Sequence, residues 1–317
     1  MSVAKSVRPS FRGDGATLFG IHFKNLLLTL VTLGIYSFWA KANVRQYLYA
    51  NTELGGDRFT YHGTGRELLS GAFRAFGLLF VIGIIAAVME GLIHPLAGFI
   101  VLYAGAGLLL FPFALIGSRR YRLSRTSWRG IRFSFRGDYG DFLAIYAVGA
   151  LATLFSLGLY YPFFHAKIRK YVVEESRFGN QAFSFSGEGG DLFGRHLLLY
   201  LLLPLTLGIY WFWYSAYRHR YYWEHTRFGT TRFRSTMTGG ELLGMVFVNG
   251  LLTIFTLGLA YPWIQARMMR FQCEKLELSG LEAFEAAQQE FQQSSSFGEG
   301  VADALDMEMA GADFFGL

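Results

Sequence analysis

Charged residues and cysteines are scarce in this 317-residue chain. Only 16% of the residues are charged, against about 25% in a typical soluble domain. The single cysteine, Cys273, excludes a disulfide framework and any metal site built from several cysteines. The sequence has no Walker A, H-E-x-x-H or G-x-S-x-G pattern, each of which marks a known chemistry. We therefore predict a protein that is not an enzyme and has no catalytic residues, metal site or cofactor.

Long apolar runs fill much of the chain, and 52% of the residues are hydrophobic. Four runs contain no charged residue: 91–118, 142–164, 197–217 and 242–266. About 20 such residues suffice for a helix to cross a bilayer, whereas a helix on a soluble core usually keeps a polar face. The sequence therefore predicts an all-α integral membrane protein with several membrane segments.

One pattern recurs five times. A typical unit opens with a Gly-rich segment, continues as an apolar run, and ends with basic residues and a short aromatic strand, and in four of the five units a glycine interrupts the run. The interrupting glycines are Gly34, Gly158, Gly208 and Gly258. Self-similarity at a fixed period is typical of repeat proteins. We predict a five-unit internal repeat of Gly-broken helices with short aromatic β-strands at the interface, in units 13–62, 63–136, 137–186, 187–236 and 237–280.

The placement of basic residues predicts the topology. Seven arginines lie within 119–136, whereas the turn at 90–95 has no Lys or Arg, so the positive-inside rule places 119–136 in the cytoplasm. Segments 68–89 and 91–118 would then both cross. A single crossing in every later unit would put alternate basic clusters outside. The glycine breaks allow a second arrangement, in which each unit enters the membrane and returns. Both arrangements remain open.

The two ends of the chain differ in charge. Residues 1–12 form a short basic arm, and the last Lys or Arg of the chain is Lys275. Nine acidic residues follow it. Residues 281–317 are rich in Glu, Gln, Ser and Gly, which is typical of a flexible segment. We predict an acidic flexible tail that could contact a protein partner.

The motifs now assembled resemble a known family. The segments FRGDG, LVTLGIYSFWAKANVRQYLYANTELGGDRFTYHGTG and TLGLAYPWIQARMMRF are similar to those of the YjgN-like family of bacterial inner-membrane proteins, a domain of unknown function. The resemblance covers about residues 10–280. It implies a multi-pass protein of the bacterial inner (cytoplasmic) membrane, and it implies no reaction, substrate or catalytic residue.

Polar residues within the first apolar run and basic residues that follow the runs form the candidate ligand-binding set. If the units converge, these charges could meet an anionic lipid or solute, and any buried charge would need a partner or water. The same residues also fit headgroup anchoring, worth roughly 1 kcal/mol each, or hydrogen bonds between helices. The candidates are Lys24, His22, Lys41, Arg45, Lys167, Arg169, Arg218, Arg267 and Arg270.

Repeats, broken helices and basic clusters occur together in transporters. The favoured function is therefore transport or binding of an anionic or amphipathic ligand. The alternative is a structural or assembly protein of the inner membrane. The expected partners are membrane lipids with anionic headgroups, with no nucleic acid, because the aromatic strands are typical of an interface belt.

Overall fold

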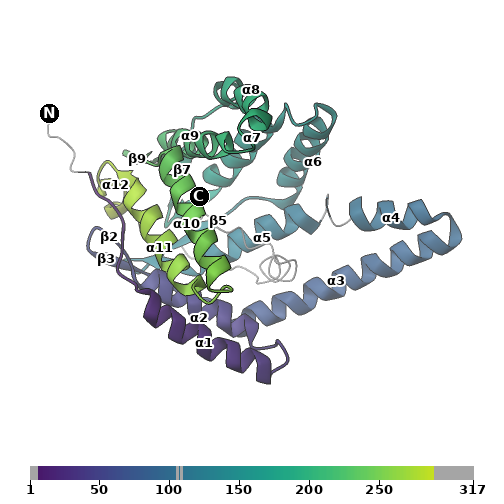
Figure 1. Cartoon of the computed structure of the whole chain (residues 1–317), viewed down its shortest axis with the longest axis horizontal. Helices are drawn as coiled ribbons and strands as arrows, with labels where there is room; N and C mark the ends of the chain where they lie inside the picture. Colours follow the sequence, from purple (N-terminus) through teal and green to yellow (C-terminus); the bar gives the residue numbers. More distant parts are fainter. Residues whose placement is uncertain (1–5, 105–106, 108–109, 289–317) are drawn as a thin grey trace.

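The computed structural model describes residues 6–104, 107 and 110–288 (Figure 1). Within them, ten short strands form one antiparallel sheet whose spatial order follows the chain. The strands are β1 Ser10–Phe11, β2 Thr52–Leu54, β3 Asp57–Tyr61, β4 Thr126–Trp128, β5 Ile131–Phe135, β6 Ser176–Phe178, β7 Gln181–Phe185, β8 Thr226–Phe228, β9 Thr231–Ser235 and β10 Leu276–Leu278.

A bridge between Val7 and Leu278 closes this sheet into a ring. Val7 donates its backbone N–H to the carbonyl oxygen of Leu278 at 2.9 Å, and Leu278 donates to the carbonyl oxygen of Val7 at 2.8 Å. Val7 precedes β1 and Leu278 ends β10, so the first and last strands become neighbours. Closure satisfies backbone groups that an open sheet would leave at its edges.

The predicted helices and short aromatic strands are present, but the all-α class is wrong, because the strands join into one ten-stranded sheet. The sequence indicates the strands locally, but most have only three or five residues, too few to show that they pair into one sheet. Their partners also lie far away in the sequence, as the pairing of Phe133 with Phe178 shows. The described fold is mostly helical but contains a ten-stranded antiparallel sheet.

Helices fill every second connection between neighbouring strands, as a pair or, between β3 and β4, as three helices, so each helical group leaves the ring and returns to it. The pair α6–α7, for example, follows β5 and ends at β6, and these two strands are hydrogen-bonded to each other. The helices are α1 Gly15–Val31, α2 Ser37–Ala50, α3 Gly65–Leu92, α4 Pro95–Ala104, α5 Phe111–Ser124, α6 Tyr139–Phe155, α7 Tyr161–Glu174, α8 Gly189–Leu205, α9 Tyr210–Glu224, α10 Gly239–Phe255, α11 Tyr261–Lys275 and α12 Glu282–Glu285.

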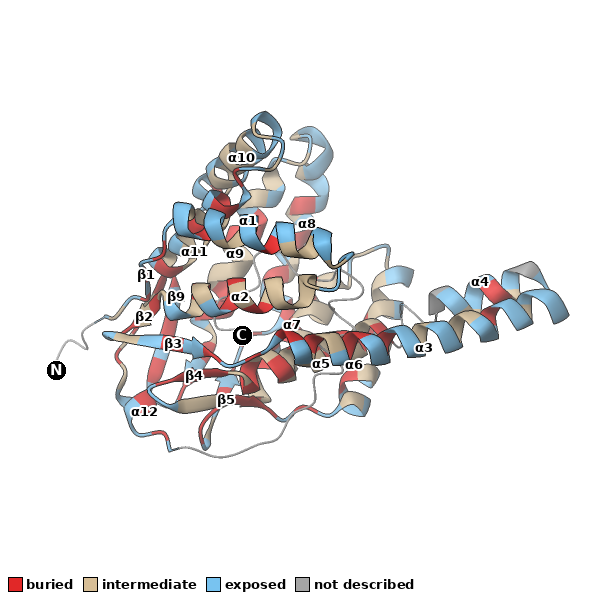
Figure 2. Cartoon of the chain, turned by 90° about the horizontal axis from the view of Figure 1, so that it is seen from below, coloured by how far each residue is buried: buried red, intermediate tan, exposed pale blue. Residues whose placement is uncertain are grey.

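The helical pairs follow one another around the ring. The first helix of a pair packs on the last helix of the preceding pair, as α8 does on α7, and α1 completes the circle on α11. Figure 1 shows the pairs spread around the molecule. In Figure 2 the strands gather at one end, and the α3–α4 arm reaches furthest from them. The base of every pair therefore lies at the strand ring.

Helix α3 is the one described helix that is long and apolar enough to cross a membrane. It has 28 residues, whereas α1, α6 and α10 have 17 each. Seventeen residues span about 25 Å, less than the ~30 Å hydrocarbon core. The predicted crossing over 91–118 is not a single helix, because α3 ends at Leu92 and α4 begins at Pro95; residues 105–106 and 108–109 lie outside the described part of the chain. Pro112, in the first turn of α5, is typical of a new helix start.

Aromatic side chains fill the inside of the ring. Strands that flank a helical pair place large apolar residues opposite each other, as with Phe133–Phe178 and Phe183–Phe228. The ring centroids of each of these two pairs are 4.7 Å apart. All four side chains are buried in one hydrophobic cluster that also contains Trp128. These contacts between strands distant in sequence hold the ring together.

Buried hydroxyls tie the strands to the helices that precede them. Thr52, Thr126, Ser176 and Thr226 each donate a hydrogen bond to the carbonyl oxygen four residues earlier, at 2.7–2.9 Å. Thr226 is fully buried and bonds Tyr222 at 2.7 Å. The buried hydroxyl group of Thr226 thus has a hydrogen-bond partner at the point where α9 ends and β8 begins.

We expect Thr226→Val to lower the free energy of unfolding by about 1 kcal/mol, because the isosteric side chain loses this hydrogen bond. The thermal unfolding midpoint in detergent measures the change. Thr230→Val, at an exposed position two residues after β8, is the matched control and should leave the midpoint unchanged. Equal midpoints for both variants would contradict the assigned role of the Thr226 hydroxyl.

Residues 281–288, where the predicted acidic tail begins, pack against the strand ring. Phe284 of α12 is buried, with its ring centroid 4.3 Å from that of Phe228 and 5.4 Å from that of Phe178. Its ring also lies 6.0 Å from Trp128 and 6.2 Å from Phe183. The segment therefore closes one end of the ring. The remainder of the predicted tail, 289–317, lies outside the described residues.

Candidate functional site

A cluster of basic, imidazole and phenol side chains lies where α7, α8 and α9 meet. Helix α7 supplies Tyr161, His165 and Arg169, and α9 supplies Tyr214, Arg218 and Tyr222. Each set has a spacing of four residues, which places its members along one helix face. Helix α8 adds His196. We call these seven residues the α7–α9 cluster.

His196 has both ring nitrogens bonded within the protein. Its Nε2 lies 3.2 Å from the carbonyl oxygen of Gly158, and its Nδ1 lies 3.2 Å from the hydroxyl oxygen of Tyr214. A carbonyl oxygen can only accept, so Nε2 carries the proton and Nδ1 accepts from the tyrosine. The imidazole is 4% exposed and stacks on Tyr161 at 5.6 Å. This geometry fits a neutral histidine in a buried polar site.

Arg218 is surrounded by phenol groups. Its Nη1 donates to the hydroxyl oxygen of Tyr161 at 2.7 Å. Its guanidinium carbon lies 5.8 Å from the ring centroid of Tyr161 and 5.7 Å from that of Tyr214, within the range of a cation–π contact. Arg218 is half-buried, and no carboxylate among the described residues forms an ion pair with it. The cluster therefore holds a positive charge that an anion could approach.

Two further contacts extend the cluster to the strand ring. Nδ1 of His165 lies 2.9 Å from the hydroxyl oxygen of Tyr222, and the two rings are parallel. The guanidinium carbon of Arg169 lies 5.7 Å from the ring centroid of Tyr222 and 5.4 Å from that of Trp223. Arg169 is buried, and Trp223 belongs to the hydrophobic core of the ring. Polar groups thus continue from the helix turn at Gly158 to the ring.

The structure brings together two of the nine candidate residues in this cluster, Arg169 and Arg218. His22 lies elsewhere, at the junction of α1 and α11, where it bonds Gln265 at 3.1 Å. Lys24 is exposed on α1. Lys167 is exposed and donates to the hydroxyl oxygen of Tyr160 at 3.2 Å.

Three of the four other candidates lie in further helical pairs. On α2, Arg45 is buried and Lys41 is half-buried, and Arg267 is half-buried on α11. Convergence of these three on the α7–α9 cluster stays a prediction.

Arg270 joins two neighbouring helical pairs. Its Nη2 donates to the carbonyl oxygen of Gly13 at 3.3 Å. Arg120 and Arg220 occupy the same position on their helices and bond the carbonyl oxygens of Gly137 and Met237, both at 2.5 Å. In the first pair a glutamine takes this place, since Gln46 donates to Gly63. These side chains link four of the helical pairs to the start of the next pair around the ring.

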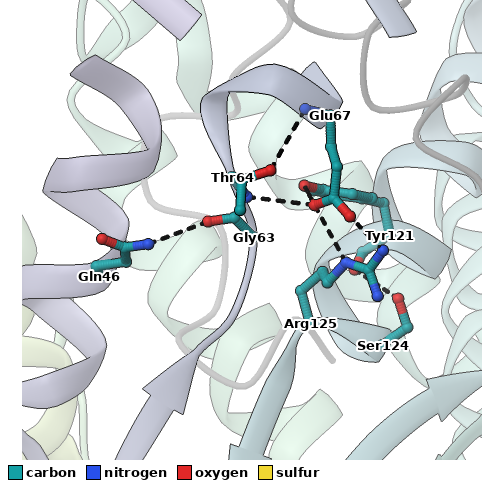
Figure 3. Close-up of polar contacts among 7 residues, drawn as sticks. All are labelled: Gln46, Gly63, Thr64, Glu67, Tyr121, Ser124 and Arg125. Carbon is teal, nitrogen blue, oxygen red and sulfur yellow. Dashed lines mark hydrogen bonds and ion pairs between the residues drawn. The ribbon is translucent and has the colours of Figure 1, made fainter. Parts of the chain in front are cut away.

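In four of the helical groups, a tyrosine on the last helix bonds the start of the first helix. Figure 3 shows the example of Tyr121, whose hydroxyl donates to Oε2 of Glu67 at 2.7 Å, while Arg125 bonds the same carboxylate. Thr64 and Glu67 also form a capping box at the start of α3. Glu67 thus caps the N-terminus of α3, where a negative charge is stabilising.

The first pair shows the same device. Asp14 accepts a hydrogen bond from the backbone N–H of Thr17 at 2.8 Å and contacts the hydroxyl of Tyr47. Hydrogen bonds from the Thr17 backbone N–H, and then from its hydroxyl, lower the pKa of the Asp14 carboxyl. Asp14 is therefore ionised at neutral pH and complements the positive end of α1.

Sequence reasoning missed His165, Tyr161, Tyr214 and Tyr222. Their signal is present in the chain as the four-residue spacing on α7 and α9. Within the described residues, no group of three or more His, Cys, Asp or Glu could hold a metal ion. The chemistry of the cluster is thus that of guanidinium, imidazole and phenol donors, which suits an oxyanion.

The chain belongs to a family of bacterial proteins of unknown function. The family model described as "Bacterial protein of unknown function (DUF898)" matches residues 6–205 and 196–304. This match confirms the family resemblance found in the sequence.

The chain is similar to named proteins of the bacterial inner membrane. It is 35% identical over 150 residues to "Inner membrane protein YjgN" of Salmonella typhimurium LT2, covering 47% of this chain and 36% of that protein. It is 38% identical over 125 residues to the protein of the same name from Escherichia coli K12, covering 39% of this chain and 30% of that protein. The matched part thus spans about a third of these relatives. No solved structure matches the chain.

Proposed function

We propose that this inner-membrane protein binds an anionic, amphipathic ligand at the α7–α9 cluster, and that its activity is to carry that ligand. The observation that carries the proposal is Arg218, a half-buried guanidinium between apolar helices, whose partners are a phenol oxygen and two aromatic faces. A half-buried charge that has no carboxylate partner is costly, so its retention between apolar helices favours a functional role. An oxyanion would neutralise this charge and accept its remaining donors.

Apolar side chains on one of the three helices that form the cluster offer a place for a hydrocarbon chain. Leu197, Leu201 and Leu205 follow one another at four-residue spacing on α8, the helix that carries His196. All three are exposed. A ligand with an acidic headgroup at Arg218 could lay its chain along this stripe, as hydrophobic burial favours. This pairing of charge and apolar surface supports an amphipathic ligand.

The continuity of the polar groups supports carriage as well as binding. Polar contacts run from Gly158, at the turn between α6 and α7, through His196 and Arg218 to Arg169 at the ring. Broken helices with basic clusters are typical of transporters. We also interpret the chain as five repeated units in a multi-pass arrangement, supported by the recurring order of strand, helix, helix and strand.

Binding of two anionic probes and their uncharged or zwitterionic counterparts tests the proposal. Purified protein in detergent is mixed with oleate or oleyl alcohol, and separately with phosphatidylglycerol or phosphatidylcholine, and native mass spectrometry measures retention. We expect at least one anionic probe to be retained at least ten-fold more than its counterpart. Preference for oleate would identify a free carboxylate, and preference for phosphatidylglycerol a lipid headgroup. Equal retention within both pairs would overturn the proposal.

An assembly role remains the alternative, and one observation favours it. The ring holds residues 281–288 firmly, with Phe284 buried and Gln288 bonded to Asn180 at 3.1 Å. Any partner that bound the acidic residues beyond this anchor would be held at the ring. A co-purifying protein that is lost when the chain stops after Gln288 would support this role.

A further inference from the structure

Four helix-to-helix turns share an unusual backbone. Leu33, Leu157, Leu207 and Leu257 have φ values of 51°, 51°, 49° and 51°, and a glycine with positive φ follows each of them. The glycine N–H then donates to a carbonyl oxygen five residues earlier, as Gly208 does to Leu203 at 2.8 Å. A leucine in this left-handed region is disfavoured because its Cβ crowds the backbone.

These leucines are also almost completely exposed. Leu33, Leu207 and Leu257 are 95%, 92% and 93% exposed. Their neighbours Phe155 and Phe255, at the ends of α6 and α10, are exposed as well. Glycine or asparagine would fit the backbone better, and a polar residue would suit water better. The occurrence of leucine in all four turns therefore indicates apolar surroundings for the side chain.

A Lys or Arg follows each of the four turns at a similar distance along the sequence. The first Lys or Arg after the turn leucine is Lys41, Lys167, Arg218 or Arg267, which is 8 to 11 residues later. At 1.5 Å per residue this is about 12–17 Å. One leaflet contributes about 15 Å of the ~30 Å hydrocarbon core. The cations would therefore lie at the headgroups when the turn reaches the middle of the bilayer.

Aromatic residues lie between the turns and these cations. Trp211, Trp213, Tyr261 and Trp263 come four to six residues after the turn leucines and are all exposed. Trp and Tyr favour the boundary between hydrocarbon and headgroups. A lipid surface with anionic headgroups matches this order of leucine, aromatic and cation.

The α3–α4 arm has a longer segment without Lys or Arg than the four helix-to-helix turns have. From Arg74 to Ile93 its first helix has no Lys or Arg, a distance of 19 residues or about 28 Å. No further Lys or Arg occurs before Arg119. This arm is long enough to cross the whole hydrocarbon core.

We propose that the four leucine turns insert into the cytoplasmic leaflet of an anionic phospholipid bilayer and end within it, whereas the α3–α4 arm crosses. The strand ring then lies in the cytoplasm together with the Arg-rich segment 119–136, as the positive-inside rule requires. Both ends of each helical pair stay on that side, because the pair begins and ends at neighbouring strands. Four turns thus insert into one leaflet, and one arm spans the bilayer.

Spin-label depth measurements test this arrangement on the full chain. Leu157→Cys, Leu207→Cys and Leu257→Cys each receive a nitroxide and are reconstituted into vesicles of phosphatidylethanolamine and phosphatidylglycerol. Cysteine has a Cβ, as leucine does, so the substitution leaves the steric limits on the turn backbone the same. Arg227→Cys on an exposed strand position and Ile93→Cys at the tip of α3 are the controls. The native Cys273 is buried. Parental protein treated with the same nitroxide reagent should show no label, because Cys273 stays unmodified.

For each label, the measured quantity is the ratio of its collision rate with oxygen to its collision rate with a water-soluble nickel complex. We expect this ratio to be at least five-fold higher for the three turn labels than for the Arg227→Cys label. The Ile93→Cys label should be accessible to the nickel complex. In spheroplasts, an impermeant maleimide should modify Ile93→Cys and none of the turn cysteines. Nickel-accessible turn labels in pure lipid vesicles would overturn the proposal by placing the turns in water. Modification of the turn cysteines from outside would overturn it by showing a full crossing.

Discussion

Arg218→Gln is expected to weaken binding of the preferred anionic probe by about 10- to 150-fold. A hydrogen bond to a charged group contributes about 1.5–3 kcal/mol, and each 1.4 kcal/mol corresponds to a ten-fold change in affinity. Glutamine retains a donor for the hydroxyl of Tyr161 but loses the charge that faces the ligand. The dissociation constant, measured by titration of the probe into purified protein, should rise while binding of the uncharged counterpart stays the same.

Two further variants separate charge from folding. Arg227→Gln removes an arginine from an exposed strand position and should leave the affinity unchanged. Arg218→Lys retains the charge but loses the planar fork that binds oxyanions at two points, so its affinity should lie between those of the parent and Arg218→Gln. If Arg218→Gln binds the anionic probe as tightly as the parent does, the α7–α9 cluster is not its site.

Phe284→Ala is expected to lower the free energy of unfolding by about 3–5 kcal/mol, the usual range for removing a buried phenylalanine. Its side chain packs on Trp128, Phe178, Phe183 and Phe228 inside the ring. The substitution would leave a cavity that these rings, held by strand pairing, cannot collapse to fill. Thermal or denaturant unfolding in detergent, followed by near-ultraviolet circular dichroism, measures the loss.

Matched truncations examine the same segment. A chain that stops after Gln288 keeps α12 and should unfold at the same midpoint as the full chain. A chain that stops after Gly280 loses the aromatic contacts of Phe284 and should be destabilised like Phe284→Ala. Glu282→Gln, at an exposed position of α12, should have no effect. A stable chain ending at Gly280 would show that residues 281–288 contribute little to the ring.

The sequence predicted local features of the fold well and missed how they combine. The glycine breaks mark real helix ends, since Gly158 and Gly208 lie in turns with positive φ. The ring could not be predicted, because each strand is very short and its partner lies beyond a helical pair. Its closure joins Val7 to Leu278 across the whole described chain, and no local pattern reports such a contact.

The candidate site was predicted in part, for similar reasons. The basic clusters that follow the apolar runs pointed to Arg169 and Arg218, which the fold places in one cluster. Tyrosines such as Tyr222 escaped notice because aromatic residues are abundant, with 18 tyrosines in the chain. Arg270 resembles a headgroup anchor in sequence but bonds the backbone of Gly13. Only the packing of neighbouring pairs distinguishes these roles.

The side of the membrane on which the strands lie tests most directly the claim that every helical pair returns to the ring. Single cysteines at Arg58, Ala182 and Thr230 would probe β3, β7 and the β8–β9 turn, because all three positions are exposed. We predict that an impermeant maleimide modifies all three in inverted vesicles and none in intact spheroplasts. Modification of Ala182→Cys from outside, with Arg58→Cys and Thr230→Cys reached only from inside, would contradict a ring on one side and would indicate pairs that cross once.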